Sequence, residues 1–160
     1  MPQDRSHRRL LFVPLLAAIV AAGTVCSDSV VGPPLGSTLA SGTWGGDNAA
    51  AIVTDSQAHI HIGCTFGDIV GPVPLSSDGS FSISGSYVLR AFPITVGPSL
   101  PAQFTGRVQQ RFGISTLTLT VVVNDTVEKK TQTLGPVAIT FGKEPNMGPC
   151  PICRVPRPAW

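Results

Sequence analysis

ISTLTLTVVVN, at residues 114–124, is the stretch of sequence that decides the fold. Leu117, Leu119 and Val121 alternate in it with threonines. A period of two places the apolar side chains on one face of a β-strand and the polar ones on the other. Beyond residue 25, no stretch of ten residues carries the apolar stripe of a helix. We therefore predict an all-β fold.

Turn-forming residues separate this stretch from similar ones along the chain. Examples are Phe112-Gly113 and Ser77-Asp78-Gly79. An Asp-Gly pair between two apolar runs is typical of a β-hairpin, because its tight turn needs a positive φ. We predict about eight antiparallel strands, near residues 40–46, 48–55, 58–65, 68–74, 80–90, 102–111, 114–124 and 132–142.

The connections between the predicted strands are mostly short, and this indicates how the strands pair. Consecutive strands joined by short loops favour a meander. Eight strands can close into a barrel, which removes the unpaired edges of the sheet. We expect a small closed or strongly curled barrel, and the alternative is a two-sheet β-sandwich.

The apolar faces of these strands carry bulky side chains. An eight-stranded barrel can be filled by side chains or can hold one small ligand, and we expect a packed core. If a cavity exists, Trp44, Tyr87 and Phe104 would line it and bind a small apolar ligand. The expected inward set is Trp44, Ile60, Ile62, Phe81, Ile83, Tyr87, Phe104, Val108, Leu117, Leu119, Val121, Val137, Ile139 and Phe141.

The N-terminal residues 1–25 have the pattern of an export signal. Arg5, Arg8 and Arg9 precede an apolar run, 10–25, that is short for a membrane-spanning helix and ends in small residues. We therefore expect the chain to be secreted or to reside in the cell envelope. Removing the signal leaves eight basic and eight acidic residues, so no excess of positive charge favours a nucleic-acid partner.

Cys26 stands where the apolar run stops and is followed by Ser27 and Asp28. This arrangement resembles the lipidation site of bacterial lipoproteins and implies an acylated Cys26, with the membrane as a partner through the lipid anchor. The alternative is simple secretion, in which Cys26 is lost with the signal. We expect a flexible tether at 26–39, a β domain at 40–145, and a C-terminal tail at 146–160 that contains prolines and cysteines.

Several motifs of the β domain resemble those of small exported bacterial β-domain proteins of unassigned function. The opening GTWGGD at 42–47, Cys64 followed by a Gly67-containing turn, and DGSF at 78–81 carry the likeness. The resemblance implies the same fold and export, and it assigns no catalytic residue. It also suggests that Cys64 joins a late cysteine, Cys150 or Cys153.

A looser likeness is to lipocalins, whose first strand also contains a Gly-x-Trp, here Gly42 and Trp44. It implies a barrel that carries a small apolar ligand.

His59 and His61 are the candidates for a metal site. They alternate along one strand, so they lie on the same face and close enough to share an ion. Cys150 and Cys153 would complete a four-ligand zinc set, but no second Cys-x-x-Cys supports it. We therefore expect two solvent-facing histidines, no metal and no cofactor. The aspartates are expected at turns, where they cap the backbone: Asp47, Asp55, Asp68, Asp78 and Asp125.

Enzymatic motifs are missing from the sequence. It has no Gly-x-Ser-x-Gly elbow and no glycine-rich phosphate loop, and a catalytic role would require His59 or His61 to meet an acidic partner. We predict an exported, envelope-tethered, non-enzymatic β domain that acts as a binding or structural module toward a protein or a small apolar ligand. The alternative is a lipocalin-like carrier of a small apolar ligand.

Overall fold

The computed structural model describes residues 35–90 and 97–149. The predicted export signal, the lipidation site Cys26 and the late cysteines Cys150 and Cys153 lie outside the described residues. Eight strands follow one another along the described chain: β1 (Gly42–Gly46), β2 (Ala49–Val53), β3 (Gln57–Ile62), β4 (Thr65–Val70), β5 (Ser80–Val88), β6 (Leu100–Arg111), β7 (Ile114–Asp125) and β8 (Lys130–Phe141).

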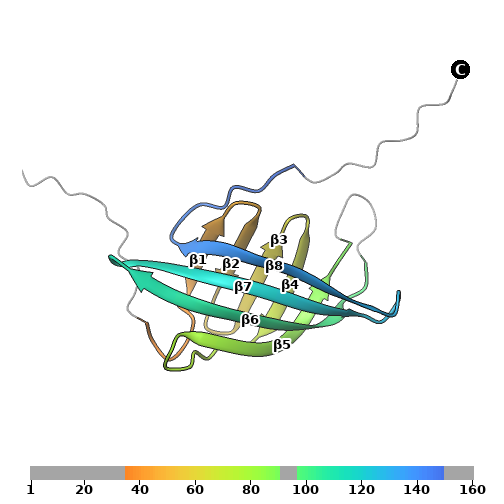
Figure 1. The fold of residues 1–160 in the computed structure, drawn as a ribbon, viewed down its shortest axis with the longest axis horizontal. Coiled ribbons are helices and arrows are strands. Elements are labelled where there is room, and N and C mark those ends of the chain that lie inside the picture. Colours follow the sequence, from red (N-terminus) through yellow and green to blue (C-terminus); the bar gives the residue numbers. More distant parts are fainter. Residues whose placement is uncertain (1–34, 91–96, 150–160) are drawn as a thin grey trace, which may run out of the picture.

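Each strand pairs antiparallel with the next, and β1 also pairs with β8 (Figure 1). This last pairing, Trp44 with Phe141 and Gly45 with Thr140, closes the sheet. The structure therefore confirms the all-β meander and decides for the closed barrel against the sandwich. Two-residue loops produce several of the tight reversals, with positive φ at Asn48, Gly63 and Phe112.

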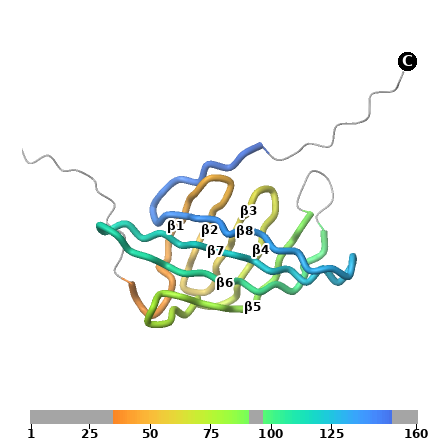
Figure 2. Tube along the Cα trace, in the orientation of Figure 1, coloured from red at the N-terminus to blue at the C-terminus, as the bar shows by residue number. Residues whose placement is uncertain are grey.

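The barrel has a short-stranded and a long-stranded half. Strands β1–β4 have five or six residues each, whereas β6, β7 and β8 have twelve. In Figure 2 the long strands run across the view, and the short ones cross behind them at a steep angle. The long half supplies most of the large core side chains, and small residues such as Ala49, Ala51 and Ala58 line the inside of β2 and β3.

The interior contains one apolar core. Every residue of the predicted inward set belongs to the core cluster or packs against it. Trp44, Tyr87 and Phe104 are among the largest of the side chains that are almost completely buried. Among the described residues, every buried side-chain nitrogen or oxygen has a hydrogen-bond partner, as the low dielectric of a core demands.

Glycines inside the strands make room for the large rings. A Cβ on Gly67 would overlap the Tyr87 ring and lie 2.9 Å from the Phe104 ring. A Cβ on Gly106 would lie 2.7 Å from the Phe81 ring. Aromatic rings therefore occupy the space above bare backbone, and this packing fills the barrel.

Strand β4 is where the predicted boundaries are most in error. We expected it near 68–74, after a turn containing Gly67, but it spans Thr65–Val70 and Gly67 lies inside it. The reversal is made instead by Gly63 and Cys64, with φ of +59° at Gly63. Asp68 therefore lies within a strand, opposite His59, and not at a turn.

The described domain is also longer than 40–145 at both ends. Leu39, which we assigned to the tether, is buried and donates its N–H to Val73 O at 2.8 Å. At the other end, the Asn146 N–H donates to Gly46 O at 2.9 Å, and Asn146 O accepts from the Asn48 N–H at 2.8 Å. The blue segment after β8 therefore runs along the β1–β2 turn (Figure 1).

Candidate functional site

Trp44, Tyr87 and Phe104, the residues that we assigned to an apolar ligand if a cavity exists, are core side chains. Trp44 Nε1 donates to Ala40 O at 3.0 Å, and the Tyr87 hydroxyl is hydrogen-bonded to Thr65 Oγ1 at 2.8 Å. The Tyr87 and Phe104 rings pack with their centroids 6.1 Å apart. The hollow beside Trp44 measures about 10 Å³, which is scarcely enough for one water molecule. The surroundings of these residues therefore lend no support to a carrier function.

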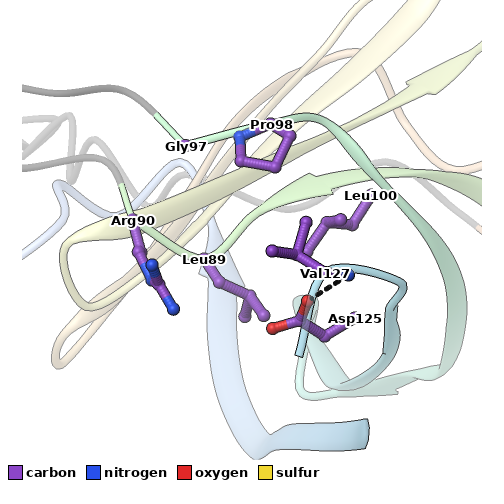
Figure 3. A pocket seen from close by; sticks show the side chains of 7 residues that line it. All are labelled: Leu89, Arg90, Gly97, Pro98, Leu100, Asp125 and Val127. Atoms are coloured by element: carbon purple, nitrogen blue, oxygen red, sulfur yellow. Dashed lines mark hydrogen bonds between the residues drawn. The ribbon is translucent and has the colours of Figure 1, made fainter. Parts of the chain in front are cut away.

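A second hollow lies at the end of the barrel where β5 stops (Figure 3). Leu89, Leu100 and Val127 line it together with Asp125, and its volume is about 30 Å³. The Asp125 carboxylate already accepts the N–H groups of Val127 and Glu128, at 3.0 and 2.9 Å. Asp125 is thus used to cap the backbone, and Arg90, which also lines the hollow, is paired with Glu128. Because the space suits only a water molecule, this hollow is a structural feature of the turn.

The outer face of β3 and β4 carries a cluster of different character. His59 Nδ1 lies 2.6 Å from Asp68 Oδ1, and His59 Nε2 lies 2.9 Å from His61 Nε2. The Phe66 ring packs against both imidazoles, with centroids 5.5 and 5.7 Å away. We call His59, His61, Phe66 and Asp68 the histidine cluster. It exists because β3 and β4 pair in a register that places His59 opposite Asp68 and His61 opposite Phe66.

The hydrogen bonds assign the protons of the cluster. An ionised carboxylate only accepts, so His59 Nδ1 donates to Asp68. In neutral His59 this leaves a free electron pair on Nε2, which accepts from the Nε2–H of His61. Burial is the largest cause that lowers the pKa of His61. The nearby His59 lowers this pKa further, and Asp68 raises it. The net shift favours the neutral imidazole of His61.

The histidine cluster borders a groove of about 240 Å³. One wall is the outer surface of β2 and β3, and the other is the segment after β8. Ala50 lies opposite His61 in the sheet, and its small side chain leaves the space open. The lining residues are Thr43, Ala50, Ala51, Ile52, His59, His61, Pro145 and Met147.

The segment that closes the groove is held by backbone contacts. Asn146 makes two backbone hydrogen bonds to the β1–β2 turn, and its Nδ2 donates to Asp47 Oδ1 at 3.2 Å. Gly45 allows the close passage, since a Cβ there would lie 2.6 Å from Glu144 C and Pro145 N. Met147 is thereby placed on the same groove as the two histidines.

The structure modifies what the sequence predicted for these residues. His59 and His61 do share the outer face, as expected, but both are half-buried and His59 has an acidic partner. Asp68 and Met147 were missed as members of the site. The alternation of Phe66 and Asp68 with buried neighbours was the available signal for Asp68, and it was obscured by reading Gly67 as a turn. No periodic signal marks Met147.

Cys64 lies in the two-residue loop between β3 and β4 and is disulfide-bonded. Its partner lies outside the described residues, so the choice between Cys150 and Cys153 stays a prediction.

Residues 35–90 and 97–149 lack two further features. They contain no helix with the length and apolar character needed to cross a bilayer. They also contain no group of three or more His, Cys, Asp and Glu side chains arranged to hold a metal ion.

Comparison with known proteins assigns no relative to this barrel. No family model matches the chain, no curated protein matches it significantly, and no solved structure does so either.

Proposed function

We propose that this chain is an exported, envelope-tethered β-barrel that acts as a binding module and not as an enzyme, and that the outer groove is its binding surface. The observation that carries the proposal is the placement of polar, half-exposed groups. His59 and His61 line a groove of about 240 Å³, and Asp68 is hydrogen-bonded to His59, while large apolar side chains fill the inside of the barrel. Convergent polar groups in a mostly apolar concavity are typical of a ligand site.

The pairing of His59 with Asp68 is also the pairing that orients a catalytic base. A base of this kind needs its other nitrogen on a nucleophile, and His59 Nε2 faces His61 Nε2 instead. This arrangement favours binding over catalysis. Hydrolysis of a chromogenic ester by the wild type and by His59→Asn tests the choice: equal background rates support the proposal, and turnover that disappears in the variant overturns it.

Export and tethering rest on the N-terminal sequence, with its arginines, apolar run and Cys26. Intact mass of the protein recovered from a bacterial envelope fraction tests both. A chain that begins at Cys26 and carries acyl groups supports the tether. A processed chain without acyl groups supports export and overturns the tether, and an unprocessed chain overturns both.

The same mass measurement, with and without reductant, tests the disulfide that we propose between Cys64 and Cys150. The Asn48 side chain lies between the described part of the tail and Gly63, the residue before Cys64. A Cβ on Gly148 would lie 3.8 Å from Asn48 Oδ1, and a Cβ on Gly63 would lie 3.5 Å from Asn48 Nδ2. Cys150 follows Gly148 by two residues, a reach of roughly 7 Å. A peptide map that joins Cys64 to Cys153 would overturn this choice of partner.

A further inference from the structure

We propose that the groove is a copper site in which His59 Nε2 and His61 Nε2 are the ligands from the barrel and the Met147 thioether is the ligand from the tail. The proposal deepens the function proposed above and rests on the groove being the binding surface. Asp68 takes the role of a positioning residue that acts through His59.

The two imidazole nitrogens are close enough to share one ion. Two nitrogens bound to one ion in tetrahedral geometry lie about 3.3 Å apart, and the two Nε2 atoms are 2.9 Å apart in the structure. Binding an ion replaces this hydrogen bond: the proton on His61 Nε2 moves to its Nδ1, and the two Nε2 atoms separate slightly and turn toward the ion. Both histidines lie on β3, so a strand and not a loop sets their separation.

Asp68 completes the outer part of such a site. Histidines that bind metals usually donate their second ring N–H to a carboxylate, which fixes the tautomer and raises the basicity of the ligating nitrogen. The hydrogen bond of 2.6 Å from His59 Nδ1 to Asp68 Oδ1 provides this contact. It leaves the electron pair of His59 on Nε2, where it accepts from His61 in the structure and would bind the ion once that hydrogen bond is replaced.

The donor set points to copper among the transition metals. Two imidazoles suit zinc, nickel and copper, and divalent copper binds most strongly to such ligands. A thioether is a soft ligand that selects monovalent copper, and Met147 lines the same groove as His59 and His61. Met147 is 38% exposed, so an ion or a water molecule that completes the coordination reaches the site from solvent.

The test uses the full chain purified from the envelope with its disulfide intact and any free thiol alkylated, so that cysteine does not contribute. Divalent copper is titrated in and followed by electron paramagnetic resonance. We expect one ion per chain with splitting from two imidazole nitrogens, and binding tighter than that of zinc or nickel. Monovalent copper is then measured anaerobically by competition with a chromophoric chelator.

Variants separate the ligands from their surroundings. His59→Asn and His61→Asn are each expected to abolish the binding of divalent copper and of monovalent copper. Asp68→Asn should weaken binding by about 10–100-fold while the nitrogen splitting stays the same, a combination that a merely structural role would not produce. Met147→Leu should weaken the binding of monovalent copper only. Ala50→Phe should weaken the binding of copper in both oxidation states, because it fills the groove without removing a ligand.

The outcomes distinguish this inference from the proposed function. If the wild type binds copper no better than the His59→Asn, His61→Asn double variant, the copper site is overturned, while export and tethering are decided separately by intact mass. Tighter binding of zinc than of copper overturns the choice of metal. Monovalent copper affinity that is unchanged in Met147→Leu overturns the third ligand.

Discussion

The inside of the barrel and the outer face of β2–β4 belong to the same strands but are built in opposite ways. Inside, Trp44, Tyr87 and Phe104 are buried and packed over bare glycine backbone. Outside, His59 and Asp68 are paired while one third or more of each side chain remains exposed. The difference indicates that the interior supplies the stability, whereas the outer face can change its chemistry with little effect on folding.

The largest expected effect comes from truncating the core. Phe104→Ala should lower the free energy of unfolding by about 3–5 kcal/mol, because it removes buried apolar area and leaves a cavity. The fully exposed Phe112 gives the matched control, and Phe112→Ala should change stability by no more than about 0.5 kcal/mol. Urea denaturation followed by circular dichroism measures both. A loss below about 1 kcal/mol for Phe104→Ala would contradict the packed interior.

A smaller but still substantial effect is expected from adding one methyl group inside. Gly67→Ala should destabilise the barrel by about 2–3 kcal/mol, because its Cβ overlaps the Tyr87 ring and forces the neighbours apart. Gly36→Ala is the control, since its nearest neighbour lies 3.8 Å away and its φ is outside the left-handed region. Equal midpoints of thermal unfolding for the two variants would show that the ring has room to move.

The interior was largely predictable from the sequence because burial leaves a periodic signal. Alternation in 114–124 identified β7 to within one residue of its end at Asp125. The same rule selected inward side chains that all belong to the core cluster or pack against it. What it did not identify was the role of Gly67, since a glycine that makes room for a ring and a glycine that makes a turn look the same in a single sequence.

The outer site was only half predictable, for a different physical reason. The spacing of His59 and His61 places them on one face whatever the partner strand. The contact of His59 with Asp68 depends on the register of β4, which the turn at Gly63 and Cys64 sets. The position of Met147 depends on backbone hydrogen bonds of Asn146, and backbone contacts leave no pattern in side-chain types.

The Tyr87 hydroxyl gives a prediction about pH. Burial raises the pKa of Tyr87, and its hydrogen bonds to Thr65 and to the backbone of Ile62 offset part of the rise. Because the folded pKa lies above the unfolded value of 10.0, the folded state keeps its proton longer. The contribution of protonated Tyr87 to the free energy of unfolding is complete below pH 10. It is lost as the pH rises through the folded pKa, by up to about 1.4 kcal/mol per pH unit.

The measurement is direct because Tyr87 is the chain's single tyrosine. Phenolate absorbance should titrate above pH 10 in the folded protein and near pH 10 in urea. Tyr87→Phe should lose about 1 kcal/mol at neutral pH through the missing hydrogen bond, and its stability should fall less steeply than that of the wild type above pH 10. A phenolate transition at or below pH 10 in the folded protein would contradict the buried position.

The smallest effect is expected for Asp68 on the outer face, and the buried Asp125 serves as its comparison. Asp68→Ala should change stability by less than about 1 kcal/mol, because a partly exposed polar pair contributes little and water replaces the lost carboxylate at His59. Asp125→Ala should cost about 1–3 kcal/mol, because the carboxylate accepts the N–H groups of Val127 and Glu128 at a position that is only 5% exposed. Urea denaturation at neutral pH measures both variants. If Asp68→Ala were as costly as Asp125→Ala, the histidine cluster would be part of what holds the barrel together, and the assignment of the outer face to binding alone would be wrong.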